Sequence, residues 1–174
     1  LPHALERDGE DLAKAFVRAV NLFSGQMCTK PGILVLIEGQ GVEPFLQWVG
    51  EAVNRTPSSE MLNRTVFENY HSVARELASS LNLVASNQKD ENESENHAFC
   101  RFFETKGADF MKNRTLRTEA FGPTSIIVRC QNEYELLEIG RAMEGSLTGT
   151  VHAHDEDKEL AKRLFPLVES RVGR

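Results

Sequence analysis

Hydrophobic positions recur along the chain at two spacings, one typical of helices and one typical of strands. Apolar residues three and four positions apart predict amphipathic helices, which we place at residues 10–22, 42–54, 65–81, 109–116, 133–143 and 156–168. Shorter apolar runs predict strands, which we place at residues 33–37, 82–86, 97–104, 125–130 and 148–153. Polar stretches at residues 55–61 and 87–96 predict loops. Strands that alternate with helices indicate an α/β fold built in layers.

Length and composition fit a single compact domain. The chain has 174 residues, 40% of them hydrophobic, and it contains neither an internal repeat nor a linker long enough to separate two domains. The strand predicted at residues 33–37 is apolar throughout, as is typical of a strand covered on both faces in a parallel sheet. The acidic run at residues 155–157 precedes the last predicted helix, where negative charge stabilises a helix start.

Charge and the first residues of the chain limit the possible partners and locations. The formal net charge of -6 argues against nucleic acid or an anionic membrane as the main partner. No apolar run reaches the roughly 18 residues that a membrane span needs. The first residues carry acids and lack the basic start and apolar run of a signal peptide, so a cytoplasmic location is expected. The chain also lacks an initiator Met, and we expect it to be a piece of a longer protein.

Three cysteines, Cys28, Cys100 and Cys130, are candidates for thiol chemistry. Their odd number and wide spacing predict neither a disulfide framework nor a zinc site, in keeping with a reducing compartment. Cys100 and Cys130 lie within apolar predicted strands and are expected to be small core residues. Cys28 lies at a helix–strand junction among small and polar neighbours. There its thiol can face a cleft and its backbone N–H can bind an oxyanion, although simple burial under a loop is the alternative.

A second candidate is the pentapeptide at residues 119–123, Glu-Ala-Phe-Gly-Pro. Its Gly-Pro pair predicts a turn directly before the strand at residues 125–130. Glu119 and Phe121 at a strand entrance can hold a polar ligand and cover an apolar ring. The alternative is a plain loop with a solvated Glu119.

Two other kinds of site are not expected. His152 and His154 lie at strand spacing and share one face, but a third ligand at suitable spacing is missing, so the pattern does not predict a metal site. The chain contains no glycine-rich phosphate-binding motif.

Two motifs resemble those of the aldehyde dehydrogenase superfamily. Gly25-Gln26-Met27-Cys28 is similar to the family's Gly-Gln-x-Cys active-site signature, and the pentapeptide at 119–123 resembles its Glu-x-Phe-Gly-Pro motif. They occur in the family's order, 119 − 28 = 91 positions apart, and the resemblance extends over essentially the whole chain. Segments 25–32, 121–130 and 142–150 are similar to the subgroup that includes 2-oxoglutarate semialdehyde dehydrogenases and a bacterial NADP-dependent fatty-aldehyde dehydrogenase.

The resemblance implies a three-layer α/β/α catalytic domain with a mostly parallel sheet, covering residues 1–174. It implies oxidation of a small-molecule aldehyde to a carboxylic acid with NADP, or with NAD, in a homodimer or higher homo-oligomer. Cys28 would attack the aldehyde carbon to give a thiohemiacetal and then a thioester. Glu119 would accept hydrogen bonds from the ribose next to nicotinamide, and Phe121 would line the nicotinamide side of the cleft.

Several parts of the family's active site are expected outside this chain. The general-base glutamate, the oxyanion asparagine and the dinucleotide-binding domain would lie upstream, and the last part of the substrate pocket and the oligomerisation strand downstream. The 174 residues are therefore expected to be inactive alone. Two alternatives stay open at this point: a non-catalytic structural or interaction domain of the same fold, and a thiol redox sensor at Cys28, which lacks a neighbouring second cysteine.

Overall fold

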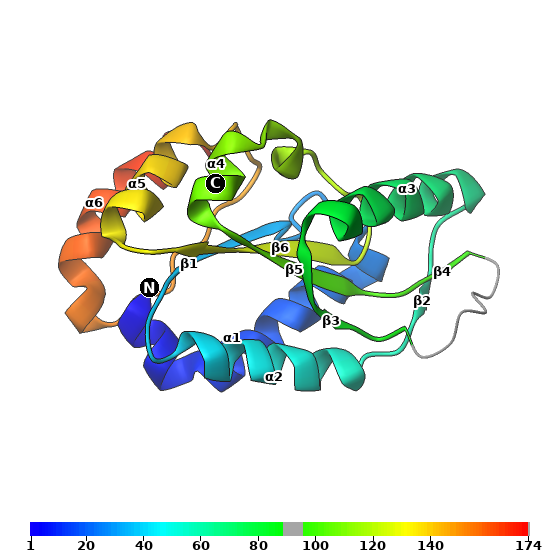
Figure 1. Ribbon diagram of the computed structural model, residues 1–174, viewed down its shortest axis with the longest axis horizontal. Helices are drawn as coiled ribbons and strands as arrows, with labels where there is room; N and C mark the ends of the chain where they lie inside the picture. Colours follow the sequence, from blue (N-terminus) through cyan, green and yellow to red (C-terminus); the bar gives the residue numbers. More distant parts are fainter. Residues whose placement is uncertain (89–95, 174) are drawn as a thin grey trace.

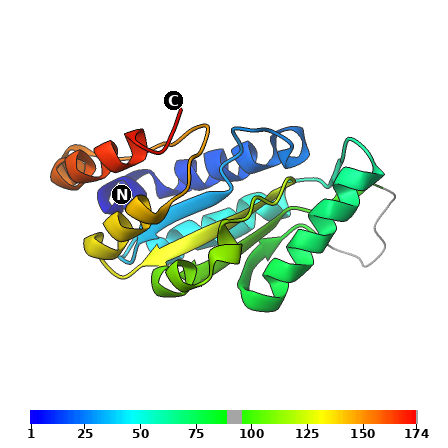
Figure 2. The same cartoon turned by 90° about the horizontal axis from the view of Figure 1, so that it is seen from above.

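A four-stranded sheet forms the middle layer of the molecule in the computed structural model, which describes residues 1–88 and 96–173. The strands lie in the order β1 (Ile33–Ile37), β6 (Thr124–Cys130), β5 (Arg101–Lys106) and β3 (Asn82–Ser86). β1, β6 and β5 run parallel to one another, whereas β3 runs antiparallel to β5. Helices lie on both sides of this sheet (Figures 1 and 2). The predicted α/β fold with a mostly parallel sheet in three layers is confirmed.

The helices divide between the two faces of the sheet. One face is covered by α1 (Pro2–Asn21) and α2 (Val42–Asn54). The opposite core includes side chains from α3 (Arg64–Ser80), α4 (Gly107–Lys112), α5 (Glu133–Ala142) and α6 (Lys158–Glu169). No helix in the described part of the chain is long and apolar enough to cross a bilayer.

The side chains of β6 alternate between two hydrophobic cores. Ile126, Val128 and Cys130 lie in the core that α3 to α6 cover, whereas Ile127 lies in the core beneath α1 and α2. Extended backbone sends successive side chains to opposite faces. A strand covered on both faces is therefore apolar at nearly every position, which explains the continuous apolar runs in the sequence.

Most predicted elements are present, several with the predicted bounds. The strands at residues 33–37 and 82–86 and the helix at 42–54 match the structure residue for residue. Four further elements differ from prediction by one or two residues at one or both ends, namely α3, β6, α5 and α6.

The first helix begins at Pro2, so the predicted start at residue 10 is wrong. Its added turns bury Ala4, Leu5 and Gly9. Two of these three residues are small, and the apolar pattern is weak for that reason. Gly9 lies against the ring of Trp48 in α2, where a Cβ atom would come within 2.8 Å of Cζ3. The close approach of α1 to α2 thus needs a residue that a hydrophobicity pattern does not record.

The strand predicted at residues 97–104 is two strands. β4 (His97–Ala98) pairs antiparallel with β2 (Ser59–Glu60), which lies within the predicted loop at 55–61, and β5 begins only at Arg101. Between β4 and β5, side chains from other parts of the chain form hydrogen bonds with the backbone. The Cys100 N–H donates to Asn87 Oδ1 at 2.8 Å, and the Phe99 carbonyl accepts from the Tyr70 hydroxyl at 2.6 Å.

Two other expectations need correction. The helix predicted at residues 109–116 is α4 followed by a separate 3-10 turn, η2 (Arg114–Arg117). The Asn113 side chain caps this turn, because its Oδ1 accepts a hydrogen bond from the Thr115 N–H. Residues 148–153 do not form a strand. Residues 148–152 line a hollow beside β1, and no backbone ladder joins them to the edge of β1 that is unpaired within the described residues. The loop predicted at 87–96 falls mostly on residues 89–95, outside those that the structure describes.

Asp157 links the two ends of the described chain. It lies at the start of α6, as expected for the acidic run, but its carboxylate also accepts from the backbone N–H groups of His3 and Ala4 at the start of α1, at 3.2 and 3.1 Å, and from that of His154 at 3.1 Å. Burial opposes ionisation, but these hydrogen bonds outweigh it and lower the pKa of Asp157 to about 2. Asp157 therefore fixes the N-terminus of α1 against α6.

We expect Asp157→Asn to lower the free energy of unfolding at pH 7 by about 1–2 kcal/mol, because it weakens a buried helix-capping interaction. The folded pKa lies below the ordinary value of 3.8, so the stabilisation is present above about pH 4 and is lost as the pH falls towards 2. Urea titrations between pH 7 and pH 2.5 measure it, with the exposed Asp155→Asn as control. A difference between wild type and Asp157→Asn that stays constant over this range would contradict the assignment.

Candidate active site

Cys28 lies on a turn whose backbone is forced into an unusual conformation. After α1 ends, the 3-10 segment η1 (Leu22–Gly25) contains Phe23, Ser24 and Gly25 with φ angles of 51°, 57° and 67°. These left-handed values cost a residue with a Cβ about 1–2 kcal/mol, whereas glycine adopts them freely. The following turn is closed by the Lys30 N–H, which donates to the Met27 carbonyl at 3.0 Å. Cys28 is exposed on this turn, and within the described residues its own N–H donates to no other group.

The turn is fixed from the side by residues 60–62. Ser24 Oγ donates to the Glu60 carbonyl at 2.6 Å, and the Leu62 N–H donates to Gln26 Oε1 at 2.9 Å. The Gln26 side chain also donates back to the Phe23 carbonyl at 3.0 Å. The glutamine of the Gly-Gln-x-Cys motif therefore holds the backbone shape that presents Cys28.

The two motifs contact each other through glycines. A Cβ atom on Gly25 would lie 2.2 Å from the carbonyl carbon and oxygen of Gly122. A Cβ atom on Gly122 would in turn lie 2.2 Å from the ring of Tyr70 in α3. Neither position has room for a side chain, so close approach explains both glycines, and the φ of 67° also explains Gly25.

Lys30 makes a further link between the motifs. Its ammonium group donates to the Ala120 carbonyl at 2.7 Å and to the Thr124 carbonyl at 3.0 Å. Burial lowers the pKa of Lys30 to about 8, with the negative charge of Glu119 acting in the opposite direction.

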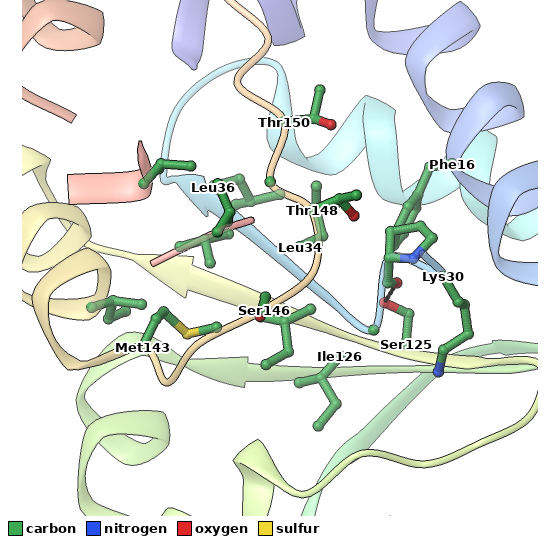
Figure 3. Close-up of a pocket in the computed structure, with 18 of the residues that line it drawn as sticks. Phe16, Lys30, Leu34, Leu36, Ser125, Ile126, Met143, Ser146, Thr148 and Thr150 are labelled. Atoms are coloured by element: carbon green, nitrogen blue, oxygen red, sulfur yellow. Dashed lines mark hydrogen bonds between the residues drawn. The ribbon is translucent and has the colours of Figure 1, made fainter. Parts of the chain in front are cut away.

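A hollow of about 900 Å³ collects the candidate residues. Cys28, Lys30, Glu119 and Phe121 all line it, together with the apolar strand β1 and the segment at residues 143–152. Figure 3 shows Leu34 and Leu36 of β1 and Thr148 and Thr150 of that segment around the same space. The thiol, the carboxylate and the aromatic ring predicted from sequence thus all line one cavity, which runs along β1, and each of them precedes the amino end of β1 or β6.

The other two thiols are buried in the cores, as predicted. Cys100 and Cys130 are 1% and 0% exposed. Burial raises the pKa of Cys100 to about 11 and that of Cys130 to about 12. Both stay protonated near neutral pH and do not behave as nucleophiles.

The two histidines with strand spacing have separate surroundings. His154 Nε2 lies 2.7 Å from Asp8 Oδ2, and the His152 carbonyl accepts from the amino group of Leu1 at 2.7 Å. Burial lowers the pKa of His152. In the described part of the chain, no three histidine, cysteine or acidic side chains are grouped so that they could hold a metal ion.

Sequence reasoning assigned no role of their own to three residues that shape the site: Ser24, Gln26 and Lys30. Each acts on a partner far away in the sequence, and the bonds of Lys30 reach residues 90 and 94 positions further along the chain. The lysine side chain beside the Pro31-Gly32 turn gave no local sign of that partner.

Sequence comparison with curated proteins relates the whole chain to aldehyde dehydrogenases. It is 31% identical over 173 residues to α-ketoglutaric semialdehyde dehydrogenase 2 of Azospirillum brasilense. This match covers 99% of this chain and 33% of that protein. It is 29% identical to α-ketoglutaric semialdehyde dehydrogenase of Acinetobacter baylyi, with 100% of this chain and 33% of that protein covered. The chain thus spans about a third of the length of these relatives. No protein-family model matches it.

Solved structures show the same relationship. 1-Pyrroline-5-carboxylate dehydrogenase from Thermus with bound NAD superposes with a TM-score of 0.73 at 25% identity, over 91% of this chain and 32% of that one. PnpE in complex with nicotinamide adenine dinucleotide shares the fold, with a TM-score of 0.79 at 16% identity over 96% of this chain and 35% of that one. By sequence, by fold and by its two motifs, the chain belongs to the aldehyde dehydrogenase superfamily and is similar to its α-ketoglutaric semialdehyde dehydrogenases.

Proposed function

We propose that residues 1–174 form the catalytic lobe of an NAD(P)-dependent aldehyde dehydrogenase that oxidises an aldehyde to a carboxylic acid. The observation that carries this proposal is the convergence of Cys28 with Glu119 and Phe121 on one cavity. Separately, each residue has an ordinary structural explanation. Together they put a nucleophile, a hydrogen-bond acceptor and an open aromatic face on the wall of one cavity, the groups that an aldehyde and a nicotinamide cofactor require.

Cys28 supplies the covalent chemistry in this mechanism. Its thiolate adds to the aldehyde carbon, and the Cys28 N–H donates to the oxygen that becomes negative. As that oxygen reforms a carbonyl, the carbon loses a hydride and the thiohemiacetal becomes a thioester. Water then adds to the thioester carbon, and the bond to Sγ breaks to release the acid and regenerate the thiol. The base that takes the proton from this water lies, in our proposal, outside these 174 residues.

The residues present fit a nicotinamide cofactor. Glu119 is an exposed carboxylate at the cavity and can accept hydrogen bonds from ribose hydroxyls. Phe121 is 42% exposed, although it directly precedes the buried entrance to β6, so part of its ring is available to a flat ligand. The cofactor supplies the hydride acceptor when bound. Glu119 and Phe121 set where that acceptor meets the carbon held by Cys28.

The finer identity of the reaction follows from the subgroup. We assign NADP as the preferred cofactor, with NAD as the alternative, and a semialdehyde such as α-ketoglutaric semialdehyde, named in both curated relatives, as the substrate class. A fatty aldehyde is the other substrate that the subgroup resemblance allows. A homodimer or higher homo-oligomer in the cytoplasm completes the proposal, and the three free cysteines are compatible with that compartment.

The cavity also supports the proposal that this lobe works within a longer protein. One of its walls is β1, which among the described strands is paired on one edge only, by β6. The relatives are about three times as long as the matched segment. We place the dinucleotide-binding domain, the base and the remaining wall of the cavity in that additional chain.

We expect Cys28→Ser in the full-length protein to lower kcat by about 10³-fold or more, because a serine hydroxyl is a far weaker nucleophile at neutral pH. Alkylation with iodoacetamide and peptide mapping provides the matched chemical test. Cys28 should be modified first and be protected by NADP, whereas Cys100 and Cys130 should react only after denaturation. Full turnover by Cys28→Ser would instead favour a non-catalytic role for this lobe.

Glu119→Gln is expected to raise the KM for the cofactor by about 10-fold or more, since a hydrogen bond to a charged acceptor contributes about 1.5–3 kcal/mol. Glu169→Gln, at the exposed end of α6, is the matched control and should leave KM unchanged. Steady-state kinetics with the cofactor as the varied substrate measures both. An unaltered cofactor KM in Glu119→Gln would remove Glu119 from the cofactor site.

The isolated 174 residues are expected to show no aldehyde oxidation, because the base and the dinucleotide-binding domain are not among them. The measurement is NADPH formation by absorbance with an aldehyde substrate. Turnover by the isolated segment would show that the active site is complete without additional chain.

A further inference from the structure

We propose that Lys30 is a positioning residue that fixes the distance between the Cys28 nucleophile and the loop that carries Glu119 and Phe121. This inference rests on the proposed function, because it assigns Lys30 a role in the same reaction. Neither motif that identifies the family includes Lys30, and no part of the mechanism above uses it.

The first evidence is the geometry of its hydrogen bonds. The two carbonyls that Lys30 Nζ contacts, those of Ala120 and Thr124, flank the Phe121-Gly122-Pro123 loop at both ends. One ammonium group therefore fixes the two points between which Phe121 is held. Figure 3 shows the Lys30 side chain on the wall of the cavity near Ser125 of β6.

The second observation is that Lys30 also belongs to the nucleophile turn. Its backbone N–H donates to Met27 and closes the turn around Cys28. The residues after it are tied to β6, because Ser125 Oγ donates to the Pro31 carbonyl at 2.8 Å and the Ile126 N–H donates to the Gly32 carbonyl at 3.0 Å. The backbone of Lys30 thus moves with Cys28, while its side chain holds the opposite loop.

The third observation concerns the charge. An ammonium group loses hydration energy when it is buried, and the lowered pKa of Lys30 records that cost. Charge-assisted hydrogen bonds to two carbonyls and the attraction of Glu119 compensate for it. A methionine fills the same volume but leaves both carbonyls without this donor.

Loss of the two hydrogen bonds from Lys30 Nζ should slow hydride transfer. If the loop that carries Glu119 and Phe121 moves relative to Cys28, the hydride donor and acceptor are no longer held at reacting distance. A misplacement of about 1 Å can cost on the order of 10²-fold in rate. Attack of the thiol on an alkylating reagent needs no such alignment and should be unaffected.

The test compares Lys30→Met and Lys30→Arg with wild type in the full-length enzyme, and uses the exposed Lys162→Met as the matched control. We expect kcat of Lys30→Met to fall by about 10–100-fold, with unchanged iodoacetamide reactivity of Cys28 in the absence of cofactor. Lys30→Arg, which keeps a charged donor, should recover part of this loss. Lys162→Met should match wild type.

Two further readouts separate positioning from simple loss of folded protein. With an aldehyde deuterated at C1, the isotope effect on kcat should rise in Lys30→Met, because hydride transfer becomes slower than the other steps. Lys30→Met combined with Glu119→Gln should lose less activity than the product of the single losses, since both act through one loop. A smaller active fraction alone changes neither quantity.

The outcomes distinguish this inference from the proposed function. If Cys28→Ser abolishes turnover but Lys30→Met keeps the wild-type kcat and isotope effect, the role of Lys30 is wrong and the proposed function stands. If Lys30→Met loses activity with an unchanged isotope effect and multiplicative losses in the double variant, Lys30 is only structural. If Cys28→Ser keeps full turnover, the proposed function itself fails.

Discussion

The parallel pairing of β1 with β6 is the constraint on which the candidate site depends. In this pairing Ile33 is opposite Ile126, so the segments that enter the two strands arrive at the same end of the sheet. One of these segments carries Cys28 and the other carries Glu119 and Phe121. A register shift of one residue would turn the strand side chains to the wrong cores and separate the two loops. The apolar faces that bury β6 on both sides therefore also determine whether the thiol and the carboxylate share a cavity.

The contact between the loops is made mainly by backbone. Gly25 lies against Gly122, Gly122 lies against the Tyr70 ring, and the Lys30 ammonium binds two carbonyls. α3 belongs to this arrangement because it supplies Tyr70, whose hydroxyl also holds the Phe99 carbonyl. Such contacts have little tolerance for movement, since each glycine is already at the limit of approach. The site is thus positioned by closely packed parts of the domain, and the hydride transfer that we propose would require such preorganisation.

Sequence reasoning recovered the parts of this arrangement that local pattern controls. The buried strand at residues 33–37 and the amphipathic helix at 42–54 were predicted to the residue, because apolar periodicity reports burial directly. The first turns of α1 were missed because Ala4 and Gly9 make their contacts without a large apolar side chain. Residues 148–153 contain the β-branched residues that favour a strand, but a strand also requires a backbone partner, which composition does not report.

The residues of the candidate site also fall into two groups, those that a local sequence pattern reveals and those that it does not. Cys28, Glu119 and Phe121 could be named from the chain because they belong to short motifs with a recognisable order. Lys30 could not, because the information that gives it a role is a distance to carbonyls 90 and 94 residues away. Lysine is also a residue that local reasoning assigns to the surface by default.

The candidate residues precede the amino ends of β1 and β6, and the carboxyl ends of these strands carry a cluster of charges. There, Arg129 at the end of β6 binds Glu38, Glu43 and Glu104 at 2.7, 2.6 and 3.0 Å. One guanidinium thus joins residues that follow β1, begin α2 and lie in β5, and the hydrogen bonds that it donates to these carboxylates raise the pKa of Arg129. This end of the sheet is closed by ion pairs between neighbouring strands. At the amino end, the two loops are held by contacts between glycines and by the part-buried Lys30 ammonium, and the cavity passes beside Cys28.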